Sequence, residues 1–246
     1  MNRIRQVATI AAGVVLIGLG ILNFVYRDSL LTWQPTPHDA SWKLPFAIVS
    51  GILLIVGGAG LFVPRWRARA AMLASGWIGL WALLLHLPQV AMAPNVGSLL
   101  GVAESSFMAL GLATLTGCFD TDRRAMLLRL GVGLCAVIFG VSHFVYADFT
   151  AQMVPPWLPD RLGIAYLTGS IHALTGVCLL AGLRVRVAAT IEALMMSSFV
   201  LLLHIPAIAG APHDRLQLTM GGMAALLSLA AWLVASWSAL KRDAVG

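Results

Sequence analysis

The sequence predicts an all-α polytopic membrane protein with eight transmembrane helices, arranged as two parallel four-helix repeats. The first observation is composition. Apolar residues make up 59% of the chain and charged residues 11%, whereas about a quarter of the residues in a soluble domain are charged. The mean hydropathy is +0.88. The second observation is that the apolar runs reach the roughly 20 residues that a helix needs to cross a bilayer. The third is an internal repeat.

The repeat appears first in two short motifs. The His-x-Pro motif at 86–88 returns at 204–206, a spacing of 118 residues, and Phe-Val-Tyr at 24–26 returns at 144–146, a spacing of 120. A period this long indicates a duplicated half and not a solenoid, whose repeats are about 20–50 residues long. Each half can therefore be compared with the other, position by position.

The alignment of the two halves defines the expected domains. Residues 45–94 align with 163–212 without a gap and share 14 identities in 50 positions. We expect a first four-helix repeat at 1–119 (the first half), a cytoplasmic connector at 120–126 and a second repeat at 127–246 (the second half). Because each half has four spans, an even number, both enter the membrane in the same direction and the repeats are parallel.

The expected spans follow the apolar runs in order. The first is preceded by Arg3 and Arg5 but lacks a clear small-x-small cleavage site, so we expect it to be retained as a helix and not removed as a signal. The first connection of each half is long, at about 27–43 and 148–161, and is rich in Pro and Trp. The predicted spans are approximately 7–26, 44–63, 70–92, 98–118, 127–147, 162–182, 187–209 and 217–239.

The basic residues predict the orientation. Of the 16 Lys and Arg residues, 12 fall on one side of the predicted path and four, Arg27, Lys43, Arg161 and Arg215, fall on the other. Cytoplasmic loops carry such an excess, so we expect a protein integral to the plasma (cell inner) membrane with both termini cytoplasmic. The pI near 9.9 then reflects contact with the lipid bilayer and not nucleic-acid binding. The twelve are Arg3, Arg5, Arg65, Arg67, Arg69, Arg123, Arg124, Arg129, Arg184, Arg186, Lys241 and Arg242.

Two prolines interrupt the third and seventh spans. Pro88 and Pro206 each lack an N–H, which leaves a backbone carbonyl without its partner four residues earlier, at Leu84 and Leu202. A histidine stands two residues before each proline. We expect His86 and His204 to bind these carbonyls, so their roles are structural or those of secondary ligands.

Ionisable residues within spans are costly and are functional candidates. We expect His143, His172 and Glu104 to gather in a pocket in the outer half of the membrane. Their counterparts in the other half are Asn23, Leu54 and Gly222, so the site is single and is built mainly by the second half. Glu192, near the cytoplasmic end of its span, is expected to pair with Arg184 and Arg186. The expected ligand-binding residues are His143, His172, Glu104, Tyr166 and Trp157.

The chemistry of this group leaves two cofactors open. An imidazole can donate a hydrogen bond to a quinone oxygen, exchange a proton near neutral pH or bind haem. Quinone is the first candidate, and haem, on two symmetry-related histidines, is the second. No metal site is expected, because the sequence has neither a His-x-x-x-His nor a Glu-x-x-His pattern and no set of cysteine ligands.

Part of the second half resembles a known family. Gly140–Phe144 (GVSHF), Met153–Pro159 (MVPPWLP), Tyr166–Gly169 (YLTG) and Gly176–Leu180 (GVCLL) are similar to motifs of DoxX-like membrane proteins. The resemblance covers 130–212 well and the first half loosely. It implies a four-helix unit and, in a few relatives, the membrane subunit of a thiosulfate:quinone oxidoreductase; most members have no established activity. The matching residues are His143, Pro155, Pro156, Trp157, Pro159, Tyr166 and Gly169.

Three functions follow as hypotheses. The first is a redox- or quinone-associated protein that binds a small lipophilic ligand in the outer pocket, as the membrane subunit of a quinone-linked oxidoreductase; the sequence leaves open whether the chain is itself catalytic. The second is a non-enzymatic assembly factor or partner subunit of another membrane protein complex. The third, a transporter, is disfavoured because the proline-broken helices break near one face and not at the midplane.

Overall fold

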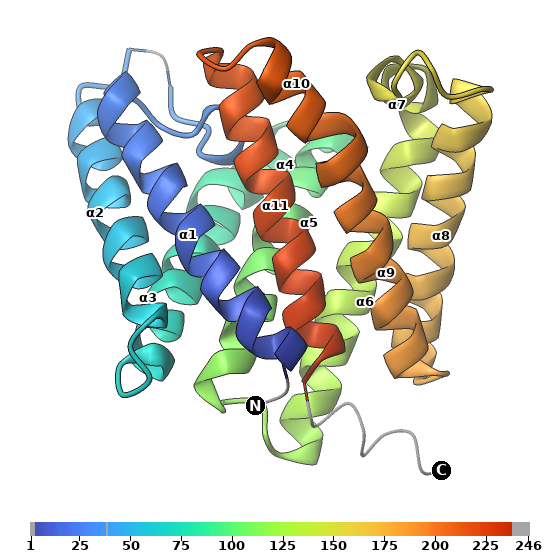
Figure 1. Ribbon diagram of the computed structural model, residues 1–246, viewed down its shortest axis with the longest axis horizontal. Helices are drawn as coiled ribbons and strands as arrows, with labels where there is room; N and C mark the ends of the chain where they lie inside the picture. The colour runs from blue at the N-terminus through green and yellow to red at the C-terminus, as the bar shows by residue number, and fades with distance from the viewer. Residues whose placement is uncertain (1–2, 38, 238–246) are drawn as a thin grey trace.

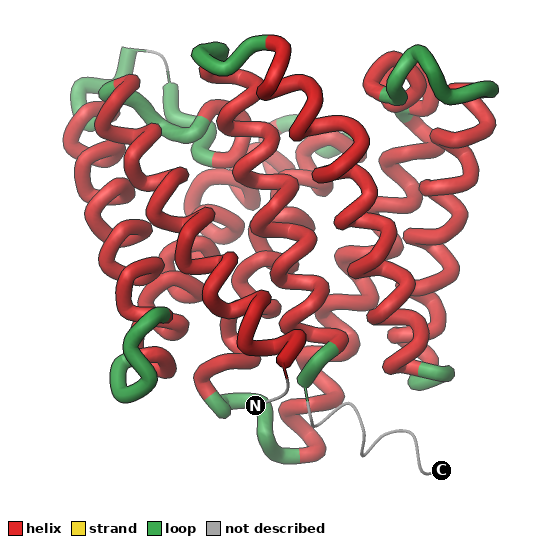
Figure 2. Tube along the Cα trace, in the orientation of Figure 1, coloured by secondary structure: helices red, strands yellow, loops and turns green. Residues whose placement is uncertain are grey.

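The computed structural model describes residues 3–37 and 39–237, and these residues form helices joined by loops, with no strand among them (Figure 2). The α-helices are α1 (Arg3–Tyr26), α2 (Lys43–Leu61), α3 (Arg67–Leu80), α4 (Leu87–Met92), α5 (Val96–Ala113), α6 (Asp122–Val145), α7 (Ala147–Met153), α8 (Arg161–Ala181), α9 (Val185–Phe199), α10 (Ile205–Gly210) and α11 (Arg215–Ala235). Short 3₁₀ helices are η1 (Leu31–Trp33) and η3 (Thr114–Thr116), and π-helical segments are η2 (Trp81–His86) and η4 (Val200–His204).

Eight helices are long and apolar enough to cross a membrane, and they confirm the polytopic all-α fold. The third runs unbroken from α3 through η2 to α4, and the seventh from α9 through η4 to α10. Both α1 and α6 rise from the same end of the bundle in Figure 1, so the two halves run in the same direction. The spans are Arg3–Tyr26, Lys43–Leu61, Arg67–Met92, Val96–Thr116, Asp122–Val145, Arg161–Ala181, Val185–Gly210 and Arg215–Ala235.

The two ends of the bundle differ in their connections. The basic end carries the turns 62–66, 114–121 and 182–184, and the start of α1; the loop end carries 27–42, 93–95, 146–160 and 211–214 (Figure 1). Ten of the twelve arginines and lysines expected on one side belong to the basic end or to the helix turns next to it. The other two, Lys241 and Arg242, lie outside the described residues.

In the first half, α1 and α2 approach so closely that glycine is required at the crossing. A Cβ built on Gly13 would lie 2.8 Å from the carbonyl oxygen of Gly58, and one built on Gly20 would lie 2.7 Å from that of Gly51. Both distances are shorter than a Cβ can tolerate. Small residues at such crossings let membrane helices pack through their backbones.

The second half repeats this crossing between α6 and α8. A Cβ on Gly133 would lie 3.0 Å from the carbonyl oxygen of Gly176, and one on Gly140 would lie 2.8 Å from that of Gly169. These four glycines follow those of the first half by 120 residues on the first helix and by 118 on the second. Both halves therefore share one packing scaffold, and three of the glycines lie in the motifs of the family resemblance.

The two halves contact each other through the first and last helices of each half. The first helix of each half packs on the last helix of the other, as α1 on α11 and α6 on α5, and α5 packs on α11 between them. At this last contact Gly111 faces Ala230, whose Cβ would lie 2.5 Å from a Cβ at position 111.

The helices accommodate Pro88 and Pro206 by a change in their own backbone hydrogen bonds, and not in the way that the sequence predicted. The helix before each one widens into a π-helical turn, in which Leu87 N–H donates to Ala82 O and Ile205 N–H donates to Val200 O, five residues earlier. Such a turn shifts the backbone hydrogen bonds by one residue around a proline. The expectation that His86 binds the backbone carbonyl of Leu84 is wrong. The histidine instead binds a backbone carbonyl in the loop of its own half, as described below.

Candidate functional site

A buried histidine–carboxylate pair lies inside the second half. His172 of α8 places Nδ1 2.6 Å from Oε1 of Glu192 of α9, and both side chains are almost inaccessible to solvent. The second carboxyl oxygen, Oε2, lies 2.6 Å from the hydroxyl of Thr175, one turn along α8 from His172. The carboxyl group thus has a polar partner on each oxygen in a segment that is otherwise apolar.

His143 of α6 completes the cluster. Its ring centroid lies 5.0 Å from that of His172, and its Nδ1 donates to the carbonyl oxygen of Phe139 at 2.9 Å. Phe199 of α9 stacks on His143 with a centroid separation of 6.2 Å, and Phe139 meets His172 edge-on at 5.6 Å. Three helices therefore hold two imidazoles and one carboxyl group between two aromatic rings.

Two hydrogen-bonding arrangements are compatible with the distances in the cluster. Either an ionised Glu192 accepts hydrogen bonds from His172 and Thr175, or a protonated Glu192 donates to one of them; both arrangements satisfy the distances. Thr175 adapts to either, because its hydroxyl also lies 2.9 Å from the carbonyl oxygen of Ile171. Among the described residues, Nε2 of His143 and Nε2 of His172 have no hydrogen-bond partner. Each is a free position for a ligand atom.

A groove of about 550 Å³ lies at the loop end of the second half. The end of α7 and the turn after it form one wall, with residues 152–157 and with Arg161 at the start of α8, and the bent seventh span forms the other, with Leu202, Leu203, Pro206 and Ala207. Leu202 and Leu203 of the groove follow Phe199 by three and four residues, about one turn of this helix, and Phe199 contacts both histidines of the cluster. Its lining is mostly apolar, which suits a lipophilic molecule.

The two aromatic residues predicted for the site have different places. Trp157 is 66% exposed and lines the groove. Tyr166 lies on the exposed face of α8, where it stacks on Phe144 at 6.2 Å. Its described contacts are with Phe144 and not with the histidines.

Glu104 belongs to the polar network of the first half. Its Oε2 accepts a hydrogen bond from the indole N–H of Trp33 at 2.8 Å, and neither His143 nor His172 is its partner. The backbone carbonyl of the same tryptophan accepts a hydrogen bond from Nε2 of His86 at 3.0 Å. Glu104 and His86 thus hold one loop residue from two sides, and the expectation that Glu104 joins the two histidines is corrected.

The loop residue after Trp33 is also drawn into the first half. The fully buried Gln34 accepts hydrogen bonds from Leu30 N–H at 2.9 Å and Asn23 Nδ2 at 3.2 Å, and it donates to the hydroxyl of Ser50. Trp77 Nε1 donates to the same hydroxyl at 3.1 Å. We call residues 30–34 the inserted segment; it fills the interior of the first half with the protein's own polar groups.

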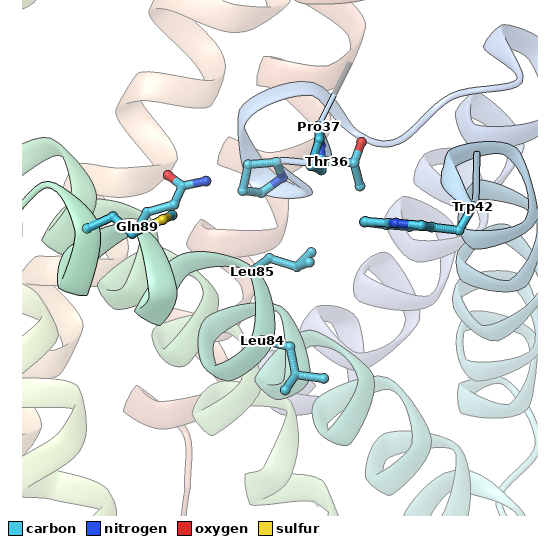
Figure 3. A pocket seen from close by; sticks show the side chains of 8 residues that line it. Thr36, Pro37, Trp42, Leu84, Leu85 and Gln89 are labelled. Atoms are coloured by element: carbon cyan, nitrogen blue, oxygen red, sulfur yellow. The ribbon is translucent and has the colours of Figure 1, made fainter. Parts of the chain in front are cut away.

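A groove of about 420 Å³ lies at the loop end of the first half. Figure 3 shows Trp42, the residue before α2, on one side of it, Leu84, Leu85 and Gln89 of the third span on the other, and Thr36 and Pro37 between them. Leu84, Leu85 and Gln89 correspond to Leu202, Leu203 and Ala207 of the second groove. The two grooves are therefore equivalent in place and differ in what lies beneath them.

Two members of the second-half cluster were missed or misassigned from the sequence. Glu192 does not pair with Arg184 or Arg186, because its carboxyl group is bound to His172 and Thr175. Counting residues from the helix end placed it too close to the basic end, whereas α8 and α9 bring it level with His172. Phe199 was not considered, although its place beside a histidine motif in an apolar span was a usable signal.

No three His, Cys, Asp or Glu side chains of the described residues come together as a metal-ligand set. Comparison of the chain with protein-family models, with curated proteins and with solved structures found no match.

Proposed function

We propose that the second half binds a small lipophilic ligand with a polar head group, of the quinone class, and that the protein is redox-associated. The observation that carries the proposal is the buried His172–Glu192–Thr175 cluster, with His143 beside it. Phe199, which contacts both histidines, lies about one helical turn from Leu202 and Leu203 of a mostly apolar groove. A quinone oxygen accepts hydrogen bonds and takes up protons on reduction, and a histidine–carboxylate pair supplies both.

The roles of the residues follow from their positions. His172 donates to, or exchanges a proton with, the head-group oxygen through Nε2, while Glu192 holds its ring and balances its charge. Thr175 fixes the carboxyl group. His143 provides a second hydrogen bond through Nε2, and the groove residues, Trp157 included, contact the apolar tail. The resemblance to DoxX-like proteins supports this class of ligand.

The surroundings belong to the same proposal. We infer that the basic end faces the cytoplasm, following the positive-inside rule, so that the groove opens on the outer half of the plasma membrane. A membrane redox subunit that exchanges electrons with the bound ligand is the partner this function requires. The groove and not the cytoplasmic face is then the entrance for the ligand from the bilayer.

The test is the absorbance spectrum and the lipid extract of the purified protein. We expect a quinone-class compound in the extract, no Soret band, and loss of the compound in His172→Ala and Glu192→Gln. The matched control is Glu104→Gln, which alters the buried carboxyl group of the other half and should keep the compound. A Soret band would favour haem, and an empty wild-type protein with a stable co-purified protein would favour the partner-subunit hypothesis.

A further inference from the structure

The two His-x-Pro histidines stand at equivalent positions but have different partners. Nε2 of His86 binds the carbonyl oxygen of Trp33. His204 is only 8% exposed, and it has no hydrogen-bond partner among the described residues. The fully buried side-chain atoms without a partner do not include the ring nitrogens of His204, so these nitrogens remain accessible to a small molecule, whereas Nε2 of His86 is taken by the protein's own carbonyl.

The inserted segment of the first half explains this difference. The carbonyl that His86 binds arrives on residues 30–34, which enter the bundle from the loop end. The corresponding connection of the second half forms α7 and a turn, and its residues 152–157 line the groove instead. The second half therefore keeps the histidine but lacks the carbonyl oxygen that the first half provides.

The ring of His204 is also seated differently from that of His86. The His86 ring lies directly against α5, where a Cβ on Gly101 would be 2.3 Å from Nδ1. The counterpart of Gly101 is Thr219, so that position on α11 carries a side chain, and the Cβ of His204 lies 3.5 Å from a Cβ built at Gly221. His204 is thus not fixed against its neighbouring helix in the same way.

We propose that His204 donates a hydrogen bond to a carbonyl oxygen of the lipophilic ligand, in the place that the Trp33 carbonyl takes at His86. The inference rests on the proposed function and adds the chemistry of the head group: a planar ring with carbonyl oxygens on opposite sides. One oxygen binds His204 and the other binds the His143–His172 cluster. Phe199, five residues before His204 and in contact with both rings of the cluster, supports the face of the ligand ring between them.

The experiment is a titration of the purified protein with decylubiquinone, followed by tryptophan fluorescence. His204→Ala should raise the Kd about tenfold, the size expected for the loss of one hydrogen bond to a buried group, at an unchanged melting temperature. His204→Gln, which keeps an N–H donor, should recover most of the affinity. His86→Ala is the matched control: it should lower the melting temperature and leave the Kd unchanged. Decylbenzene, which has no carbonyl, should bind the wild type and His204→Ala equally.

The outcomes separate this inference from the proposed function. Wild-type affinity in His204→Ala, together with loss of binding in His172→Ala, would overturn the role of His204 and leave the proposed function standing. No binding of decylubiquinone by the wild type would overturn both. A measurement without any variant is the infrared spectrum of ¹³C-carbonyl decylubiquinone bound to the wild type. Both carbonyl bands should fall to lower frequency than in the free compound, and an unshifted band would contradict the proposal.

Discussion

The first and second halves share a backbone scaffold but fill it differently. Both cross their first two helices on matched glycine pairs, and both bend their third helix through a π-helical turn before a proline. The first half then closes its interior with Trp33 and Gln34 from its own loop. The second half holds His143, His172 and Glu192, and its groove lies about one helical turn from Phe199, which contacts both histidines. The two halves therefore differ both in the first connection and in the polar residues of the interior, where Asn23 and Leu54 take the positions equivalent to His143 and His172.

The comparison also shows where the halves are tied together. Arg215, at the start of α11 in the second half, lies 3.0 Å from Asp28 and donates to the carbonyl oxygen of Ser29 at 2.7 Å. These first-half residues lead into the inserted segment. The second half therefore helps to hold the closed loop of the first, and in the first half Gly97, the counterpart of Arg215, donates its N–H to the hydroxyl of Tyr146 at the start of the second half's connection, at 3.0 Å.

The largest effect should come from the scaffold that both halves share. Gly20→Val and Gly140→Val each place a Cβ within 2.8 Å of a facing backbone oxygen, so each should lower the free energy of unfolding by about 3 kcal/mol. Chemical denaturation in detergent measures this. Gly18→Val is the control, since a Cβ there meets nothing within 4 Å. A large loss at only one of the two crossings would refute a common scaffold.

A smaller effect should distinguish the closed half from the open one. Gln34→Ala removes the partner of Leu30 N–H, Asn23 and Ser50, and it should cost about 2 kcal/mol because buried polar groups lose their hydrogen bonds. The control is Thr168→Ala, at the position that matches Ser50. The Thr168 hydroxyl binds only carbonyls of its own helix, so its loss should cost about 0.5 kcal/mol or less. Equal losses would show that the inserted segment does not stabilise the first half.

The smallest effect should be the pH dependence of the loop contact. Partial burial by itself would raise the pKa of Asp28, but hydrogen bonds from Lys43, Ser29 N–H and Arg215 together outweigh it and hold the pKa below its ordinary value of 3.8. The folded protein therefore favours the ionised form. This stabilisation is complete above pH 3.8 and is lost as the pH falls through the lower, folded pKa.

The stabilisation from the ion pairs of Asp28 should be about 0.5 kcal/mol, because Asp28 and its two basic partners are partly exposed and screened by solvent. The measurement is thermal unfolding of the wild type and Asp28→Asn between pH 2 and pH 7, with the difference shrinking at the acid end. Asp148→Asn is the matched control in the second half, since Asp148 has no ion pair within residues 3–37 and 39–237. A difference that grows as the pH falls would contradict the assignment.

The sequence was sufficient for the architecture and for part of the site. The length of the spans, the repeat and its parallel sense follow from the hydropathy of the sequence and from the spacing of the repeated motifs. The pairing of His143 with His172 was predicted because both stand out as ionisable residues in apolar spans of one half. The partner of His172 was not predicted, because the depth of Glu192 depends on how α8 and α9 pass each other.

The closed first half could not be predicted from its loop. A Pro- and Trp-rich connection at the membrane surface suits interfacial side chains, and nothing in the letters of residues 30–34 indicates that Trp33 and Gln34 enter the bundle. Because the entry of this loop was not predicted, His86 was expected to bind the carbonyl of Leu84, which Pro88 leaves without its partner. In the structure a π-helical turn rearranges the backbone hydrogen bonds before Pro88. His86 instead binds the carbonyl oxygen of Trp33, 53 positions away.

The most direct test of the account is to determine which of the two equivalent grooves holds the ligand. Crystals of the protein soaked with 6-(10-bromodecyl)ubiquinone would locate the tail through the anomalous signal of bromine and the head group through its density. We expect bromine beside residues 152–157 and 202–207, with the ring reaching His172 and His204. Bromine in the groove at 35–37 and 84–89, or equal occupancy of both, would contradict the claim that the second half alone is the binding half.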